Sequence, residues 1–327
     1  MRSLLHQQIF RRSLSTLVTE QSLSQSSCTT KFYPLSEKSQ RIKHFHFKNV
    51  LPYTIGNIIQ DNFVSRNLNL KKYDILKKNH KNKDKLSEIF ETRPEIIPPL
   101  IFSFEFDSTY TGGKREKTQV SQEQKNEYES IKNIPYIQTS RGGQTTYHGP
   151  GQAVVYPILD LTDFHKLTSK CYVSTIEKSV ISVLKNNFNL DALTTENTGV
   201  WVNTVNSNSS MKCVEKISSI GVNIKRGITS HGVSINCSTD LSFVNDPRIV
   251  MCGLDQYKQT SILNEFNKTE LDTKNFDLSV SNVSRLFADE ISSRIGISKI
   301  DHFTIDNGID CDTEKIIEEI NDKLFNF

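Results

Sequence analysis

The chain has 327 residues with 40 basic and 37 acidic side chains, and 36% of its residues are hydrophobic. That apolar share is enough for one large domain or two small ones, and it excludes a wholly disordered protein. A formal net charge of +3 is too small for a protein that coats nucleic acid. No run approaches the about 18 apolar residues of a membrane-spanning helix, so we expect neither nucleic acid nor a membrane as a partner.

The N-terminal segment has the composition of an organelle transit peptide. Its first 19 residues include Arg2, Arg11 and Arg12 but no acidic residue, and their apolar side chains are interleaved with Ser and Gln. Such a start is typical of mitochondrial import, whereas a secretory signal has an uninterrupted apolar stretch. The alternative is an N-terminal helix that docks or stays disordered. We predict a transit peptide and flexible segment over residues 1–44 and a folded domain over 45–327.

Two polar segments interrupt the expected domain. Residues 66–89 are a Lys-rich insertion, with seven lysines from Lys71 to Lys85. One interpretation of this run is a solvated helix face or loop, and the other is a docking patch for an acidic protein. Residues 112–130 have no apolar periodicity and are predicted to form a long loop.

Apolar periodicity places the regular elements in chain order. Alternating or continuous apolar runs predict strands over 100–106, 152–161, 199–202, 217–225 and 232–237. Apolar spacings of three and four predict helices over 168–188, 278–293 and 313–326, and residues 203–211 are predicted to be a hairpin tip or a small insertion. Strands and helices do not alternate regularly, which favours an α/β or α+β mixed sheet flanked by helices over a doubly wound sheet.

The densest motif is RGGQTTYHGPGQ at residues 141–152. Its four glycines allow positive φ angles and close approach of a ligand to the backbone, whose N–H groups can bind an anion or a carbonyl. It lacks both the Gly-Lys-Ser/Thr ending of a P-loop and the G-x-G-x-x-G pattern of a dinucleotide site. By composition it is either a ligand loop or an ordinary hairpin turn.

Three further segments carry reactive side chains, namely KISSIG at 216–221, HGVSIN at 231–236 and MCG at 251–253. Considered singly, Lys216 is most simply a solvated charge, His231 a hydrogen-bonded structural residue and Cys252 a core thiol. The six cysteines of the chain are scattered and form no CxxC pair, so no zinc site is predicted.

Together and in this order, the segments resemble the signature blocks of the lipoyl(octanoyl) transferases, the lipoate-protein ligase B family. The matching blocks are RGGQTTYHGPGQ, TGVWV at 198–202, KISSIG, HGVSIN, CG at 252–253 and Thr260-Ser261. The resemblance covers residues 45–295 and implies the catalytic-domain fold of biotin and lipoate protein ligases. The chain departs from the family at residues 105–113, where it lacks the His and both prolines of the family's E-H-P-P stretch. It also departs at Met251, where the family frequently has a proline.

The resemblance implies a two-step transfer of an octanoyl group from acyl carrier protein to the ε-amine of a lysine on a lipoyl domain. Cys252 would be the nucleophile and Lys216 its proton-transfer partner, because the thiolate is the attacking form and an adjacent ammonium favours it. A thioester donor needs no ATP, so no cofactor and no metal are expected. The residues implied to line the substrate site are Arg141, Gly142, Gly143, Gln144, Thr145, Thr146, Tyr147, His148, Ser219, Ile220, Gly221, His231, Gly232, Val233 and Ser234.

The acceptors implied by the resemblance are the lipoyl domains of 2-oxoacid dehydrogenase complexes and the glycine cleavage H protein, in the mitochondrial matrix. We expect the enzyme to be a monomer. Four alternatives stay open: an ATP-dependent lipoate or biotin ligase on the same fold, a lipoyl amidotransferase, an inactive binding module for carrier protein or lipoyl domains, and a cysteine hydrolase with His148 or His231 as its base. The presence of both Cys252 and Lys216 favours the transferase.

Overall fold

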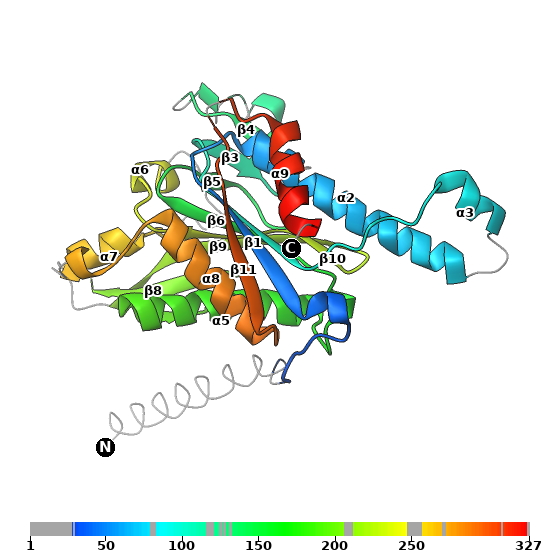
Figure 1. Ribbon diagram of the computed structural model, residues 1–327. Coiled ribbons are helices and arrows are strands. Elements are labelled where there is room, and N and C mark those ends of the chain that lie inside the picture. The colour runs from blue at the N-terminus through cyan, green and yellow to red at the C-terminus, as the bar shows by residue number, and fades with distance from the viewer. Residues whose placement is uncertain are drawn as a thin grey trace, which may run out of the picture. The chain divides into compact units, whose positions relative to one another are not determined.

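The protein is built on a mixed β-sheet to which both ends of the described chain contribute strands (Figure 1). Its strands are β1 (Arg41–Phe47), β2 (Leu100–Phe104), β6 (Gln152–Ile158), β7 (Ala192–Leu193), β8 (Val200–Val205), β9 (Lys212–Lys225), β10 (Ile228–Asn236) and β11 (Lys299–Ile305). In the part of the chain that the structure describes, these eight strands are ordered β11-β1-β2-β6-β10-β9-β8-β7. β1 pairs in parallel with β11 and β2, and the other neighbours pair antiparallel.

The computed structural model describes residues 28, 30–78, 83–115, 121–123, 126, 129–130, 133–205, 212–246, 257–269, 273–308 and 310–325. Phe32–Phe327 form one compact unit and Met1–Lys31 another. The predicted transit peptide lies, up to residue 27, outside the described residues. Among the helices that are described, none has the length and hydropathy needed to cross a bilayer.

A smaller sheet carries residues 146–148, the middle of the glycine-rich motif. It consists of β3 (Thr109–Gly112) between β4 (Tyr136–Gln138) and β5 (Thr146–His148). β3 pairs in parallel with β4 and antiparallel with β5. The Tyr147 ring of β5 stacks on Phe243 of the short helix α6 (Leu241–Val244), which anchors this sheet beside α6.

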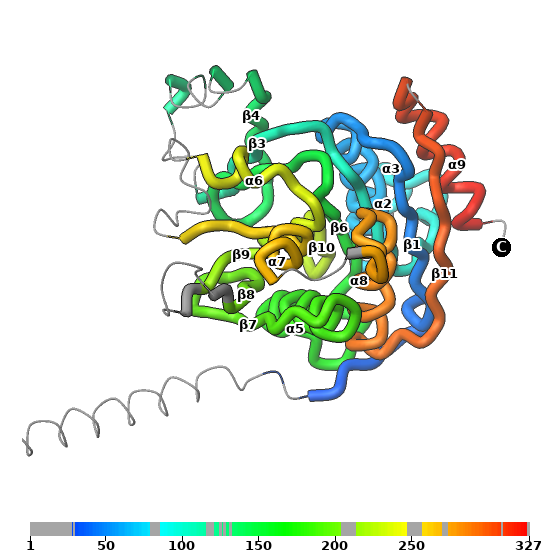
Figure 2. The backbone as a smooth tube through the Cα atoms, turned by 90° about the vertical axis from the view of Figure 1, so that its left-hand side faces the viewer, coloured from blue at the N-terminus to red at the C-terminus, as the bar shows by residue number. Residues whose placement is uncertain are grey.

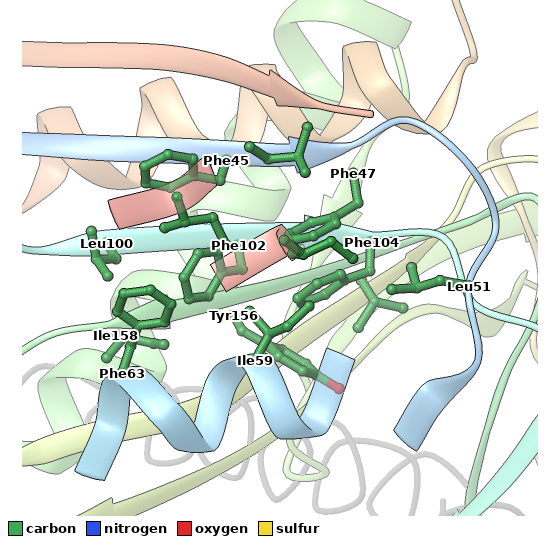
Figure 3. Close-up of a cluster of buried hydrophobic side chains, with 14 of the residues drawn as sticks. Phe45, Phe47, Leu51, Ile59, Phe63, Leu100, Phe102, Phe104, Tyr156 and Ile158 are labelled. Atoms are coloured by element: carbon green, nitrogen blue, oxygen red, sulfur yellow. The ribbon is translucent and has the colours of Figure 1, made fainter. Parts of the chain in front are cut away.

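A phenylalanine-rich core fills the space between one face of the main sheet and helices α2 (Tyr53–Lys78) and α9 (Thr313–Phe325). Alternate phenylalanines of β1 and β2 point toward Ile59 and Phe63 of α2 (Figure 3). Full burial of one such side chain contributes about 1.5–3 kcal/mol. Because successive side chains of a strand point to opposite faces, the intervening His44 and His46 lie on the other face, where both imidazoles contact Ser103 Oγ at 2.7 and 2.9 Å.

Helices α5 (Ser169–Phe188) and α8 (Val280–Arg294) cover that other face (Figures 1 and 2). α5 begins where the Thr168 hydroxyl accepts a hydrogen bond from Cys171 N at 3.3 Å, and it ends at Asn189, whose φ of 54° is left-handed. These are the usual N-terminal and C-terminal caps of an α-helix. The capped α5 places its side chains against β8 and β9, where the cavity described below opens.

The remaining short elements connect these layers. They are η1 (Glu37–Ser39), α3 (Lys83–Ile89), η3 (Leu161–Asp163), α7 (Ile262–Thr269) and η5 (Thr273–Asn275).

The mixed sheet flanked by helices that the sequence predicts is confirmed, and the three predicted helices are α5, α8 and α9. The predicted strands over 199–202 and 217–225 are β8 and β9, which are longer than expected and pair antiparallel. Of the tip or insertion predicted over 203–211, residues 203–205 belong to β8, and residues 206–211 lie outside the described residues.

Three predicted boundaries differ from the structure. The domain start expected at residue 45 falls inside β1, because Ile42 is already fully buried. The Lys-rich insertion predicted over 66–89 does not begin a new segment at residue 66, because residues 66–78 are the C-terminal half of α2. The loop expected over 112–130 has helical residues at 122–123, 126 and 129–130.

Candidate functional site

A cavity of ≈ 240 Å³ lies where three of the sequence blocks meet, among β5, β9, β10 and α5. All predicted substrate-site residues except Thr145 and Tyr147 lie in its wall, and so does Lys216. The sequence-predicted residues of this wall are Arg141, Gly142, Gly143, Gln144, Thr146, His148, Lys216, Ser219, Ile220, Gly221, His231, Gly232, Val233 and Ser234. Cys252 and Gly253 lie outside the described residues.

The alternation of strand β5 explains why Tyr147 is not in this wall. Thr146 and His148 face the cavity, so Tyr147 between them points to the opposite side. There its hydroxyl lies 2.8 Å from Ser108 Oγ and its ring stacks on Phe243. Tyr147 thus contributes to packing, and Thr145 is fully buried outside the wall.

The side chain of Arg141, the first residue of the glycine-rich motif, is held in place by hydrogen bonds to β3 and to its own loop. Its Nη2 donates to Thr111 Oγ1 at 2.9 Å, and its Nη1 donates to Gly142 O at 3.1 Å. The loop is tied to β9 by a hydrogen bond of 2.9 Å from Gly142 N to Val222 O. The buried Nε of Arg141 has no hydrogen-bond partner in the described structure. A fixed cation with one unused donor is suited to a carbonyl or carboxylate oxygen of a ligand.

Lys216 of β9 is 3% exposed, and its ammonium is held from two sides. Nζ donates to Thr198 O at 3.0 Å and lies 5.4 Å from the centre of the Trp201 ring. Gly199 has no side chain to obstruct it, and a Cβ at that position would lie 2.6 Å from Lys216 Cε. A solvated lysine, which is the simplest interpretation of the sequence, is therefore excluded.

The segment that follows Cys252 in the chain runs beside Lys216. Lys216 N donates to Lys258 O and Thr260 N donates to Lys216 O, each at 2.9 Å, as a parallel bridge with Gln259 between them. Asn236 Nδ2 of β10 also donates to Thr260 O at 2.9 Å. Residues 258–260 are thus anchored to the two strands that form the cavity.

His231 occupies an unusual backbone position within β10. Its φ is 55°, and its N–H donates to Gln60 Oε1 of α2 instead of to a strand carbonyl. β10 pairs with β6 from Val233 onward, and Ile228 forms an isolated bridge with Asp160 beyond the end of β6, but His231 pairs with neither. Left-handed backbone at a non-glycine residue costs roughly 1–2 kcal/mol and occurs where the surroundings impose it. The side-chain amide of Gln60 is the imposing group here.

The two histidines of the cavity wall are uncharged. Burial and, to a smaller extent, the positive charge of Arg141 together lower the pKa of His231 to about 3. His231 Nε2 lies 3.2 Å from Ser140 Oγ, and its buried Nδ1 has no partner within the described residues. Burial likewise lowers the pKa of His148 to about 3, and its Nδ1 lies 2.8 Å from Gln152 Oε1.

Sequence reasoning missed several residues that shape the cavity. Val154, Tyr156 and Val173 add apolar wall, and Asn197 and Thr198 add backbone next to Lys216. Gln60 sits in a helix that was not predicted, so no local signal pointed to it. Val173 belongs to the apolar stripe of α5, which has the same sequence pattern whether it packs on a core or lines a cavity.

The cavity therefore combines an apolar stretch with two fixed cations, Arg141 and Lys216, with the exposed cation Arg115 and with two neutral imidazoles. None of its described wall residues is a carboxylate. Within the described residues, no group of three His, Cys, Asp or Glu side chains has an arrangement that could hold a metal ion. Such a wall can hold an apolar chain and orient a polar, uncharged or anionic group at one end.

Known proteins resemble this chain in sequence and in fold. The sequence matches the lipoyl protein ligase A/B catalytic domain over residues 82–294. It is 35% identical over 310 residues to the mitochondrial octanoyltransferase of Saccharomyces cerevisiae, covering 84% of this chain and 88% of that protein. It is 34% identical over 329 residues to the mitochondrial octanoyltransferase of Kluyveromyces lactis, covering 91% and 92%. The crystal structure of P. falciparum LipL1 in complex with lipoate shares the fold, with a TM-score of 0.50 and 13% identity over 87% of this chain and 71% of that one.

Proposed function

Because the chain belongs to the lipoyl protein ligase A/B family and, within it, to the octanoyltransferases, which are acyltransferases, we propose that it transfers an octanoyl group from acyl carrier protein to a lysine of lipoyl domains. The observation that carries the proposal is the buried Lys216 in the wall of a partly apolar cavity, next to the segment that follows Cys252.

In the proposed first step, the Cys252 thiolate attacks the thioester carbonyl of the octanoyl carrier protein. The bond from the carbonyl carbon to the carrier sulfur breaks, and the leaving thiolate takes a proton from the Lys216 ammonium. The product is an octanoyl thioester on Cys252 with a neutral Lys216. A thiolate is the reactive form, and an ammonium nearby raises its share at neutral pH.

In the second step, the ε-amine of the acceptor lysine attacks the octanoyl-Cys252 carbonyl. The bond to the Cys252 sulfur breaks, the amine loses a proton to Lys216, and the resting thiolate and ammonium are restored. A thioester is exchanged for an amide, so the proposal involves no ATP, metal or cofactor. The buried position of Lys216 in the cavity wall supports this role, because a proton-transfer partner must lie within reach of the reacting groups.

The acyl chain is proposed to occupy the apolar part of the cavity, against Val154, Tyr156, Val173 and Val233. At about 0.8 kcal/mol per buried methylene, the chain beyond its carbonyl contributes about 6 kcal/mol to binding.

The proposed setting is the mitochondrial matrix, with the lipoyl domains of 2-oxoacid dehydrogenase complexes and the glycine cleavage H protein as acceptors and a monomeric enzyme. The transit-like N-terminus and the mitochondrial relatives from two yeasts support this location.

The Lys-rich segment is the proposed contact for the acidic carrier protein. Among its described lysines, Lys77 and Lys78 are the pair chosen for the test. Lys71 pairs with Asp160 at 2.7 Å, and Lys72 lies 5.8 Å from the centre of the Phe90 ring. Lys77 and Lys78 end α2 and are exposed. Reversing the charge of both should raise the KM for carrier protein, whereas the same change at the exposed Lys315 of α9 should not. Equal KM values at low salt would contradict the docking proposal.

Intact-protein mass spectrometry of the full chain with octanoyl acyl carrier protein, without ATP, tests the function. We expect a gain of one octanoyl group that is absent in Cys252→Ser and is discharged when an apo lipoyl domain is added. Octanoylation that needs ATP and free octanoate would instead identify a ligase. Preference for an octanoylated lipoyl protein as donor would identify an amidotransferase, and release of free octanoate would identify a hydrolase.

A further inference from the structure

A carboxylate on helix α5 supports the backbone that holds Lys216. Glu177 Oε1 accepts a hydrogen bond from Gly199 N at 3.2 Å. The residue before Gly199 is Thr198, whose carbonyl accepts the hydrogen bond from Lys216 Nζ at 3.0 Å. Glu177 thus reaches Lys216 through a single peptide unit. Val173, one helical turn earlier on α5, lies in the cavity wall, so the same helix contributes to both features.

Gly199 transmits any movement of this turn directly to Lys216. Its φ of 132° is a conformation that L side chains rarely adopt, and a Cβ there would lie 2.6 Å from Lys216 Cε and 3.2 Å from Nζ. The stem of Lys216 therefore lies against bare backbone.

Glu177 also acts through its charge. It is half-buried, and burial raises the pKa of its carboxyl, while the Gly199 amide and the positive charges of Lys216 and Lys178 oppose that rise. Lys178 is exposed on α5 itself, and Lys216 of β9 is close enough for its charge to act on Glu177. Since none of the described wall residues of the cavity is a carboxylate, Glu177 supplies negative charge to Lys216 from behind the wall.

We infer that Glu177 is a positioning residue for the transfer reaction. Its carboxylate holds the Thr198–Gly199 peptide against Lys216 and stabilises the ammonium form of Lys216, so it sets the pH above which the resting enzyme loses the proton needed by the leaving carrier thiolate. This inference rests on the proposed function, in which Lys216 donates that proton.

Two substitutions separate the two contributions of Glu177. Glu177→Gln keeps an acceptor oxygen for Gly199 N but removes the charge, and Glu177→Ala removes both. Glu290→Gln is the matched control, because Glu290 forms an ion pair with Arg294 on the surface of α8, outside the cavity wall. The measurement is kcat/KM for octanoyl transfer over about pH 6–10, together with the KM of each substrate.

We expect Glu177→Gln to move the basic limb of the pH profile to lower pH by about one to two units, with KM values unchanged within about twofold, since a unit charge at several ångströms from the ammonium has that effect at an effective dielectric of about 20 to 40. Glu177→Ala should show the same shift and lose about another tenfold in kcat, because Gly199 N is then unsatisfied. Glu290→Gln should follow the wild-type profile.

A folded fraction that stays constant over this pH range scales the whole profile and leaves the limb in place, so circular dichroism of each variant across the same range separates unfolding from the expected shift. A Glu177→Gln profile that overlays the wild-type profile, while the wild type transfers octanoyl groups, would overturn the inference and leave the proposed function standing. A wild type that forms no octanoyl-Cys252 adduct would remove both.

Discussion

The hydrogen bond from His231 N to Gln60 offers a direct test of how α2 shapes the cavity. In Gln60→Leu the side chain keeps its approximate volume but loses the oxygen that accepts from His231 N. Gln60 is fully buried, so water cannot replace that oxygen. A buried N–H without a partner costs about 1–3 kcal/mol. In addition, His231 loses the contact that keeps its φ at 55°, a conformation that is itself unfavourable by roughly 1–2 kcal/mol.

We therefore expect Gln60→Leu to destabilise the protein by about 2 kcal/mol and to displace the His231 ring from the cavity wall. Urea unfolding measures the loss in the free energy of unfolding. The displacement of the His231 ring should lower kcat/KM for octanoyl transfer by about tenfold or more. Asn67→Leu is the control, because Asn67 is another buried amide of α2 but donates to Phe63 O within its own helix. Equal effects of the two substitutions on kcat/KM would refute the reasoning.

Three further changes have defined outcomes. Gly199→Ala should abolish most octanoyl transfer because the new Cβ meets Lys216 Cε, whereas Gly308→Ala, with a φ of 59° and nothing within 4 Å, should cost stability but not kcat; similar kcat losses in a steady-state assay would contradict this. Val173→Phe fills apolar cavity space and should shift the preference to shorter acyl chains in a competition assay; an unchanged preference would mean that the chain lies elsewhere. Burial lowers the pKa of His46 to about 4 in the folded protein, below its unfolded value near 6.5, so its stabilisation is complete above about pH 6.5 and about 2 kcal/mol of it is lost by about pH 5. His46→Gln should flatten the pH dependence of unfolding over that range, and an unaltered slope would exclude this assignment.

Much of the fold could be predicted because its elements have local signals. The apolar residues of α5, α8 and α9 recur at helical spacing, and their burial follows that spacing. β1 was missed because the sequence RIKHFHF places histidines on the face toward α8, where a polar pattern normally indicates solvent. β11 was missed because its sequence KIDHFTI is largely polar.

The candidate site shows the same division. The glycine-rich motif, the Lys216 block and the His231 block are recognisable in sequence because they combine unusual residues in a fixed order. Gln60 and Glu177 have no such signal, since each is one polar residue in a long helix. Gln60 matters because it accepts a hydrogen bond from His231 N, and Glu177 because it accepts one from Gly199 N. Only the tertiary fold brings these partners together.

The pairing of β1 with β11 has a consequence for how this chain can fold. Arg41 of β1 pairs with Lys299 of β11, so β1 can complete its pairing only after a strand more than 250 residues later has been synthesised. A chain that leaves a ribosome, or crosses a membrane pore, with its N-terminus first therefore exposes one edge of β1 until its last residues arrive. Non-local pairings of this kind form slowly and leave strand edges open to wrong partners. Loss of residues 299–327 would destabilise the fold, because it would leave one edge of β1 unpaired and remove the α9 side chains Ile316, Ile320 and Leu324 from the phenylalanine core. The β11 pairing and the α9 side chains therefore support the half of the sheet against which α2 packs, and α2 contacts the cavity through Gln60.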